Sequence, residues 1–142
     1  MLKAVIDINL FVSGLISKKG SPARLLRLWR DHAFLLVISE QMVQEIESVL
    51  QYPHIKNKYN LKDEEIEQAV STIKKFAVLL PDTIELDVVK DDPDDNKVLA
   101  CALAIKADYI VSGDSHLLEL GIFEDIPIVT VKDFLGFIES GT

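Results

Sequence analysis

The chain has 142 residues, of which 49% are hydrophobic, and it carries a formal net charge of −8. This length fits one domain, residues 1–142, and the hydrophobic content excludes a disordered chain. The negative charge argues against a protein that holds nucleic acid by net charge alone. The one cysteine, Cys101, lies in an apolar run, so we expect it to be buried and the protein to be cytoplasmic.

The charge is distributed unevenly along the chain. Residues 1–80 hold 11 Lys and Arg against 9 Asp and Glu, whereas residues 81–142 hold 4 against 14. Acidic residues at this density repel one another, so the second half is either a solvated acidic surface or part of a cation site. We see no signal-like leader and no apolar run of membrane-spanning length, and we therefore expect no membrane insertion.

The first half of the chain alternates apolar runs with helical patterns. A buried strand is predicted at residues 3–6 and ends at Asp7. Ser21 followed by Pro22 predicts an N-cap and the first position of a helix that continues through Arg30. The next elements expected, in chain order, are a strand at 33–38, a helix through 50 capped by Ser39, a short helix from Pro53 and a long helix at 61–80.

The second half continues the alternation. The elements expected, in chain order, are a strand or edge segment at 84–89, a helix from the acidic stretch 92–95 to 106, a strand at 109–112, a short helix ending before Gly121, a strand at 128–130 and a helix at 132–139. Strands without polar alternation are covered by helices on both faces. The pattern therefore predicts an α/β fold, a three-layer α/β/α sandwich with a central parallel sheet.

Two carboxylates follow predicted strands directly. Asp7 ends the first strand, and Asp114 follows Ser112 and Gly113 after a later one. Ligands of such sheets bind beyond the carboxyl ends of the strands. Each carboxylate is either a ligand or only the N-cap of the next helix, and both interpretations stay open. Asn9 is either a turn residue or an amide that orients Asp7 or a phosphate, and Ser112 offers a hydroxyl beside the carboxylate.

Two further acids lie on predicted helices. Glu45 recurs with Met42 and Val49 at helical spacing, so it lies in or beside a buried stripe, where a carboxylate is costly unless it is paired or bound to a cation. Asp95 continues the inward stripe of its helix one turn earlier, and Asp92 is the alternative ligand in the same stretch. For Glu45, a boundary residue whose carboxylate reaches water is the competing interpretation.

Together, Asp7, Glu45, Asp95 and Asp114 predict a metal site at one edge of the sheet. Ligation by oxygen alone favours Mg²⁺ or Mn²⁺, since His32, His54, His116 and Cys101 show no zinc spacing. A metal held in this way activates water for attack on a phosphodiester. We expect Asp7, Asp95 and Asp114 to hold the metal, Glu45 to act with them, and Asn9, Ser112 and Asp92 to support them.

Four segments resemble the PIN domain family in order and spacing: residues 5–14 (VIDINLFVSG), 39–45 (SEQMVQE), 92–96 (DPDDN) and 111–118 (VSGDSHLL). The chain is most similar to small prokaryotic PIN proteins of the VapC type, the toxins of toxin–antitoxin pairs. The resemblance implies an α/β/α sandwich, a Mg²⁺- or Mn²⁺-dependent ribonuclease, a homodimer and a cognate antitoxin. Ile8 and His116 depart from the family pattern, but neither removes a core acid.

Basic residues predict where RNA binds. Lys18, Lys19, Arg24 and Arg27 lie in a stretch without acids, and Lys56, Lys58 and Lys62 surround Tyr59. We expect these residues to bind the RNA backbone beside the acidic cleft, with ordinary solvated charge as the alternative.

Two other functions fit parts of the pattern. A phosphatase of the haloacid dehalogenase type is disfavoured, because Asn9 occupies the position of its second aspartate. The other is a PIN-like module that binds RNA or protein without catalysis.

Overall fold

The computed structural model describes residues 1–81 and 93–140, except for the side chains of residues 93–95. Within the described residues, the strands form one sheet with the order β3-β2-β1-β4-β6-β5. The strands are β1 (Lys3–Ile6), β2 (Leu35–Ser39), β3 (Val78–Leu80), β4 (Tyr109–Val111), β5 (Ile122–Phe123) and β6 (Ile126–Val129). All neighbours pair in parallel except β5 and β6, which are antiparallel. The sheet is therefore mostly parallel, with one antiparallel strand at its edge.

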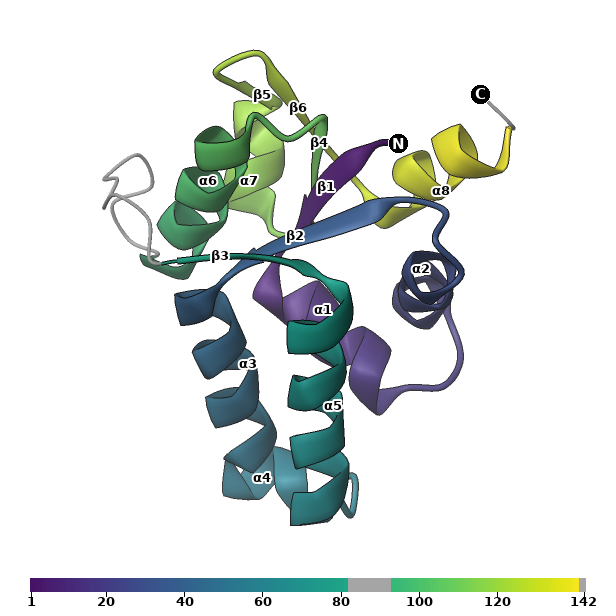
Figure 1. Cartoon of the computed structure of the whole chain (residues 1–142), viewed down its shortest axis with the longest axis vertical. Helices are drawn as coiled ribbons and strands as arrows, with labels where there is room; N and C mark the ends of the chain where they lie inside the picture. Colours follow the sequence, from purple (N-terminus) through teal and green to yellow (C-terminus); the bar gives the residue numbers. More distant parts are fainter. Residues whose placement is uncertain (82–92, 141–142) are drawn as a thin grey trace.

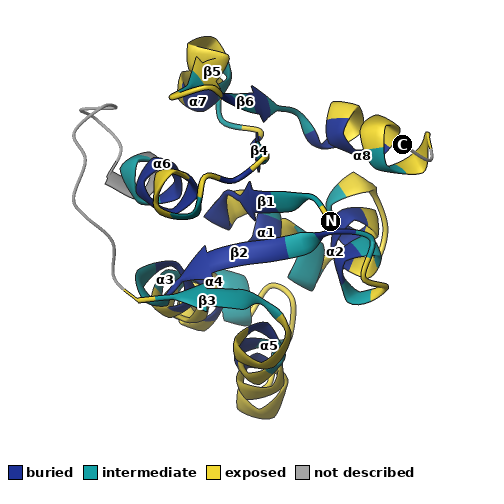
Figure 2. Cartoon of the chain, turned by 45° about the horizontal axis from the view of Figure 1, so that its top comes forward, coloured by how far each residue is buried: buried dark blue, intermediate teal, exposed yellow. Residues whose placement is uncertain are grey.

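Helices cover both faces of the sheet, which confirms the predicted α/β/α fold (Figures 1 and 2). In one layer, α1 packs against α2 and α3, and α3 packs against α4 and α5. Helix α6 packs against β1, β2 and β4, and α7 packs against β6. Helix α8 packs against α2. The helices are α1 (Ile8–Ile16), α2 (Ser21–Arg30), α3 (Glu40–Gln51), α4 (Pro53–Lys56), α5 (Asp63–Phe76), α6 (Pro93–Ile105), α7 (Ser115–Leu120) and α8 (Val131–Glu139).

The centre of the sheet carries the core. Val5 and Ile110 are fully buried on adjacent strands, and Phe34 meets Phe134 of α8 edge to face, with 5.1 Å between ring centroids. Cys101 on α6 is also fully buried, as predicted, and burial raises the pKa of its thiol to about 12. Among the described residues, no helix has the length and hydrophobicity needed to cross a membrane.

Helix α1 was absent from the sequence prediction. Its residues are mostly apolar, and Ile8, Phe11 and Val12 are buried between the sheet and its neighbouring helices, so the sequence shows little amphipathic period. Gly14 allows the close approach of α2: an added Cβ there would lie 2.7 Å from Leu26 Cδ1. The apolar stretch after Asp7 is therefore a packed helix and not a loop.

Three further predictions needed correction, and one lies outside the described part. The N-cap of α2 is Gly20, with φ of 97°, and not Ser21, because the turn before the helix uses the left-handed region. The predicted helix 61–80 ends at Phe76, and the β-branched and leucine run after it forms β3. The short strand β5 was not predicted, since two residues give no visible alternation. The segment predicted at 84–89 lies outside the described residues.

Candidate active site

Asp7 and Asp114 lie at the carboxyl ends of adjacent parallel strands. Asp7 follows β1 and Asp114 follows β4 by three residues, and the two strands pair with Ile6 opposite Val111. The chain moves from β1 to β2 and β3 on one side, and then crosses to β4 on the other side. This change of direction opens a crevice between the ends of β1 and β4, which is where parallel sheets bind ligands.

The Asp7 carboxylate is buried, and it accepts three hydrogen bonds. Its Oδ1 accepts from the backbone N–H of Leu10 at 2.8 Å and so caps α1. Its Oδ2 accepts from the Ser112 hydroxyl and from the backbone N–H of Gly113, the latter at 3.2 Å. These contacts fix the carboxylate between β1 and the turn after β4. Asp7 is thus the N-cap of α1 through Oδ1, while its Oδ2 contacts the turn after β4.

The pKa of Asp7 is raised above its ordinary value of 3.8. Desolvation by burial is the largest cause, and the nearby negative charge of Asp114 acts in the same direction. The hydrogen bonds from Ser112, Leu10 and Gly113 lower the pKa but do not reverse the shift. A buried carboxylate with a second acid beside it is an environment that a bound cation would relieve.

Asp114 is held by the turn that follows β4. Its backbone N–H donates to the Ser112 hydroxyl at 2.9 Å, and its Oδ1 accepts from the backbone N–H of His116 at 2.7 Å, which caps α7. The side chain of His116 is 56% exposed, and its Nδ1 lies 3.7 Å from Asp114 Oδ1. Ser112 therefore connects the two acids, since it donates to Asp7 and accepts from the backbone of Asp114.

The two acids share an open pocket of about 240 Å³. The other lining residues are Asn9, Leu10, Ser13 and Gly113. The pocket therefore offers two carboxylates, an amide and a hydroxyl. Asn9 belongs to the first turn of α1, which places it beside Asp7 as expected for a polar supporting residue.

Glu45 lies at the border of the buried face of α3, next to Ile46, while Gln44 and Glu47 are exposed. Its carboxylate is not among the residues that line the acidic pocket, and it forms an ion pair with Lys97 of α6. The side chains of Glu45 and Lys97 are 24% and 30% exposed, respectively. Of the two interpretations of Glu45, the structure gives a partly buried carboxylate paired with a cation.

Asp95 belongs to the first turn of α6, the helix that packs against β1, β2 and β4. The sequence pattern predicts Val98, Leu99, Ala102 and Ile105 as the inward stripe of this helix; the first three are buried and Ile105 is half-buried. The side chain of Asp95 and the whole of Asp92 lie outside the described residues.

The predicted RNA-binding residues Lys18 and Lys19 lie beyond the far end of α1. Its nine residues span about 14 Å at 1.5 Å per residue. Arg24 pairs with Glu139 of α8, and Arg27 donates to the Lys18 carbonyl at 3.4 Å. The charge of Arg24 is therefore paired with Glu139. Arg27 contacts the backbone of Lys18, so Arg27, Lys18 and Lys19 form a basic group after the end of α1.

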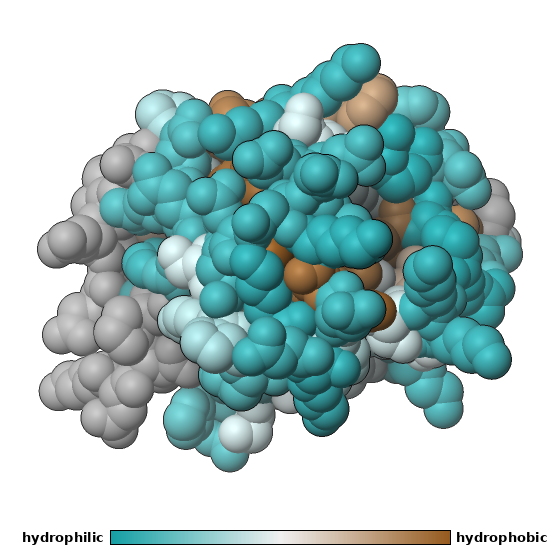
Figure 3. Space-filling view, turned by 90° about the horizontal axis from the view of Figure 1, so that it is seen from below, coloured by the Kyte–Doolittle hydropathy of each residue, from teal (hydrophilic) through white to brown (hydrophobic). Residues whose placement is uncertain are grey.

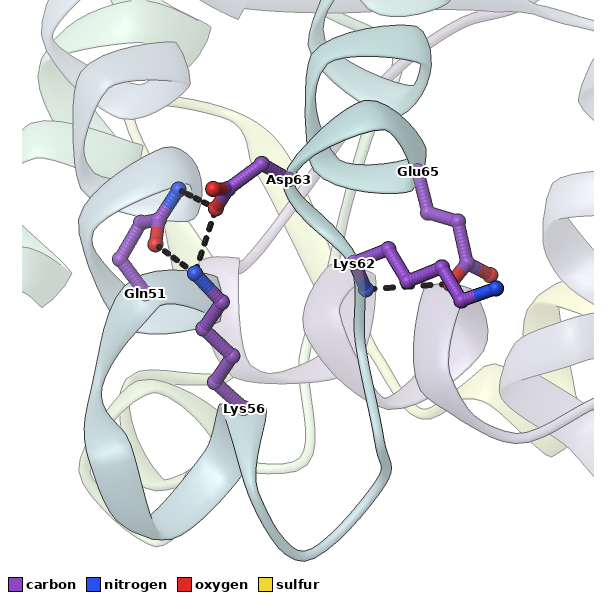
Figure 4. A network of polar contacts seen from close by, with 5 residues as sticks. All are labelled: Gln51, Lys56, Lys62, Asp63 and Glu65. Atoms are coloured by element: carbon purple, nitrogen blue, oxygen red, sulfur yellow. Dashed lines mark hydrogen bonds and ion pairs between the residues drawn. The ribbon is translucent and has the colours of Figure 1, made fainter.

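One lysine of the second basic cluster, Lys56, forms an ion pair within the fold. Lys56 pairs with Asp63 and donates to Gln51 at 3.1 Å, which ties α4 to the start of α5 (Figure 4). This contact lowers the pKa of Asp63. Lys62 is the N-cap residue of α5, and its backbone N–H donates to Glu65 at 3.1 Å. The hypothesis that these lysines bind RNA beside the acidic cleft is therefore weakened for Lys56.

A second hollow of about 390 Å³ lies between α1, α2, α3 and α5. Its walls are mainly apolar, including Leu26, Trp29 and Ile66, with Arg30 and Glu65 also lining it. The face seen in Figure 3 is hydrophilic over most of its area, with a small hydrophobic area near its middle. This hollow has one carboxylate and no pair of acids, so it is a weaker candidate for metal chemistry.

The donors in the acidic pocket fit a hard divalent cation. Mg²⁺ keeps several waters in proteins and is bound by one or two carboxylates together with substrate phosphates. Asp7 and Asp114 supply two carboxylates, and Asn9 and Ser13 add neutral oxygen atoms. Within the described part of the chain, no three His, Cys, Asp or Glu side chains form a metal cluster. A third carboxylate would have to come from the undescribed side chains, of which Asp95 is the predicted one.

Comparison with known proteins agrees with this architecture. A family model described as PIN domain matches residues 3–116, which includes both acids of the pocket. The chain belongs to the PIN domain family. PIN domains are generally nucleases and typically use divalent metals, so the coarse assignment of this chain is a nuclease. An uncharacterized protein of Methanocaldococcus jannaschii is 29% identical over 119 residues, which cover 84% of this chain and 75% of that relative.

Sequence reasoning missed one residue of this PIN domain that contacts a candidate catalytic acid. Lys97 lies two residues after Asp95 on α6, and its ammonium group pairs with Glu45 on α3. A signal was present, because a lysine lies two residues after the acidic stretch at the start of a helix. Nothing in that signal indicates which distant helix the lysine would meet.

Proposed function

We propose that this PIN domain is a Mg²⁺- or Mn²⁺-dependent endoribonuclease that hydrolyses RNA phosphodiester bonds with activated water. The observation that carries the proposal is the pair Asp7 and Asp114, which share one open pocket at the ends of adjacent strands. Membership of a family of nucleases supports the reaction class. RNA as the substrate is supported by the similarity to the VapC-type ribonucleases.

In this proposal, Asp7 and Asp114 hold the metal together with Asp95. A divalent ion held there would supply an activated water and positive charge opposite the phosphate. Ser112 keeps the Asp7 carboxylate oriented through its hydrogen bond. Asn9 lines the pocket, where its amide would donate to a phosphate oxygen. Glu45 on α3, outside the lining of the pocket, would act as the catalytic carboxylate that does not hold the metal.

The direct test is cleavage of a short single-stranded RNA of mixed sequence with Mg²⁺ or Mn²⁺. We expect Asp7→Asn and Asp114→Asn each to reduce the rate on the order of 10²-fold or more, and EDTA to abolish it. Asp133→Asn is the matched control, because Asp133 is an exposed acid on α8. Calorimetry with Mn²⁺ measures metal binding in the same variants.

Two outcomes contradict the proposal in different ways. Cleavage that survives both substitutions places the reaction outside this pocket. A protein that cleaves no RNA and binds no Mn²⁺ is a non-catalytic module that binds RNA or protein. Cleavage of single-stranded DNA at the same rate as RNA would overturn the substrate assignment but not the nuclease.

We also propose that the protein is a homodimer and the toxin of a toxin–antitoxin pair. The support is the resemblance of its four motif segments to VapC-type proteins. Induced expression in a bacterial host is expected to arrest growth, whereas the Asp7→Asn variant allows growth at the same protein level. Sedimentation velocity measures the oligomeric state. Unimpaired growth with the active nuclease would contradict the toxin assignment.

A further inference from the structure

An ion pair between Glu45 and Lys97 joins helices from the two layers that cover the sheet. Glu45 belongs to α3, which begins at the carboxyl end of β2, and Lys97 belongs to α6 on the opposite face of the sheet. The two helices are in direct contact, and α6 also packs against β1 and β2. The pair therefore spans the edge of the sheet from which Asp7 projects.

Partial burial makes this pair different from an ordinary surface ion pair. The side chains of Glu45 and Lys97 are 24% and 30% exposed, so both charges have lost much of their contact with water. A carboxylate in this position is costly without a counter-charge. A long glutamate side chain also has several rotamers, and a fixed ammonium group selects among them.

We propose that Lys97 is a positioning residue for Glu45, and that it keeps the Glu45 carboxylate in the orientation that the reaction needs. This inference rests on the proposed ribonuclease function and adds a residue to it. In this role the Lys97 ammonium group offsets the charge of the partly buried Glu45 carboxylate. Lys97 therefore supports turnover through Glu45 and contributes little to the binding of metal or RNA.

The placement of Lys97 allows two other roles, which give different measurements. A lysine that contacts a substrate phosphate directly would raise KM when it is removed, because it binds RNA in the ground state. A lysine that only joins α3 to α6 would lower stability and leave kcat unchanged. A positioning residue lowers kcat while KM and Mn²⁺ affinity stay nearly constant.

The experiment compares Lys97→Met, Lys97→Arg and wild-type protein on a short single-stranded RNA labelled with a fluorophore and a quencher. We expect Lys97→Met to lower kcat roughly tenfold to 10²-fold, since small errors in the position of a reacting group cost that much. KM and the Mn²⁺ dissociation constant stay within about twofold, and Lys97→Arg restores most of kcat because the cation remains. Lys132→Met is the matched control, since Lys132 is an exposed lysine on α8.

A double-mutant cycle with Glu45→Gln decides whether Lys97 acts through Glu45. If it does, Lys97→Met has almost no further effect on kcat once Glu45 is replaced by Gln. We expect a change of no more than about twofold, which is the error within which independent effects usually add. Independent effects of the two substitutions would overturn the inference. A rise in KM as large as the fall in kcat, or a failure of Lys97→Arg to restore activity, would also overturn it.

A second readout keeps this inference separate from the proposed function. The four proteins of the double-mutant cycle are wild type, Lys97→Met, Glu45→Gln and the double variant. They are unfolded in urea without metal, and their unfolding midpoints test the ion pair directly. We expect the midpoint shifts of the single variants to be non-additive, because each variant breaks the same pair. If wild-type protein cleaves no RNA, the ribonuclease proposal fails. Additive midpoints would instead show that Lys97 does not hold Glu45.

Discussion

Asp7 is an acid in a position that favours its protonated form. Burial and Asp114 raise its pKa above 3.8, so between that value and the raised pKa the native protein binds more protons than the unfolded chain. The stability contributed by Asp7 is therefore present at low pH and is lost as the pH rises through the raised pKa. This is the opposite of the usual behaviour of a paired carboxylate.

Replacement of Asp7 by Asn is expected to remove this pH dependence. Asparagine also caps helices, so the helix cap is kept in the variant. The difference in unfolding free energy between the two proteins should then shift in favour of Asp7→Asn as the pH rises. This difference in unfolding free energy can change by at most about 1.4 kcal/mol for each pH unit between 3.8 and the raised pKa of Asp7. Urea unfolding of metal-free protein between about pH 4 and about pH 7 measures it. A difference that is constant with pH would contradict a raised Asp7 pKa.

Ser112 is the hydroxyl that connects the two acids, and it is fully buried. Ser112→Ala leaves the backbone N–H of Asp114 without this acceptor and removes a donor from Asp7, so we expect a loss of about 1–3 kcal/mol in stability. We also expect weaker Mn²⁺ binding, because the Asp7 pKa should rise further without the donor. Urea unfolding and calorimetry measure the two effects. Ser71→Ala, at an exposed position of α5, is the control and should neither weaken Mn²⁺ binding nor lower stability.

At this scale, the sequence was informative about residues that follow strands. Asp7 and Asp114 were predictable because an apolar run ends directly before each of them, and parallel strands bring their carboxyl ends to one edge. The partner of Glu45 was not predictable. A lysine on an amphipathic helix contacts whatever the fold brings near it, and that depends on how α3 and α6 pack across the sheet.

At the scale of elements, the contact between α1 and α2 depends on one missing side chain. A Cβ at Gly14 would lie 2.7 Å from both Leu26 Cδ1 and the carbonyl oxygen of Pro22, and a backbone oxygen cannot move aside easily. Gly14 therefore lets two helices approach closely in a layer that also contains α3. Gly14 lies on the same helix that Asp7 caps, so the contact with α2 helps to set the orientation of α1.

Alanine substitution at two helical glycines should have opposite effects. Gly14→Ala gains up to about 1 kcal/mol in helix propensity, but the overlap with Leu26 and Pro22 costs about 1–3 kcal/mol, so we expect net destabilisation. Gly136→Ala in α8 meets nothing within 4 Å and should stabilise the protein by up to about 1 kcal/mol. Thermal unfolding of both variants tests this. A stable Gly14→Ala variant would mean that α2 moves away without cost.

Element prediction failed where packing decides the structure. Most residues of α1 are apolar, and Ile8, Phe11 and Val12 are buried, so few polar positions mark a helical period. The end of α5 was misplaced for a related reason: Val78, Leu79 and Leu80 continue the apolar pattern of the helix, yet they pair with β2 as a strand. Helices that had a capping residue and an exposed face, such as α3 and its N-cap Ser39, were predicted almost to the residue.

At the scale of the whole molecule, a net charge of −8 limits how RNA can bind. Repulsion between the chain and RNA has to be overcome locally, by the metal at the pocket and by a small number of basic side chains. Lys18, Lys19 and Arg27 form such a group, while Arg24 is held by Glu139. We therefore expect weak binding with a modest dependence on salt.

Removal of that group tests its role. The triple variant Lys18→Ala, Lys19→Ala and Arg27→Ala should weaken RNA binding and make the salt dependence shallower by about 0.7 for each lost phosphate contact, in units of log K against log salt. Arg24→Ala is the matched control and should leave the salt dependence nearly unchanged, since its charge is already engaged. Fluorescence anisotropy with an RNA oligonucleotide in EDTA, at several salt concentrations, measures both. An unchanged slope in the triple variant would assign RNA binding to another surface.

Cys101 gives this molecule an internal indicator of its own opening. The thiol is fully buried on α6, its pKa is about 12, and it is the one cysteine of the sequence. A thiol reagent added at neutral pH can react only when α6 separates from the sheet, so the rate of labelling follows the population of opened molecules. The same helix carries Asp95 and Lys97. Slower labelling in the presence of Mn²⁺ would therefore report, without any RNA, that metal binding closes α6 onto the sheet.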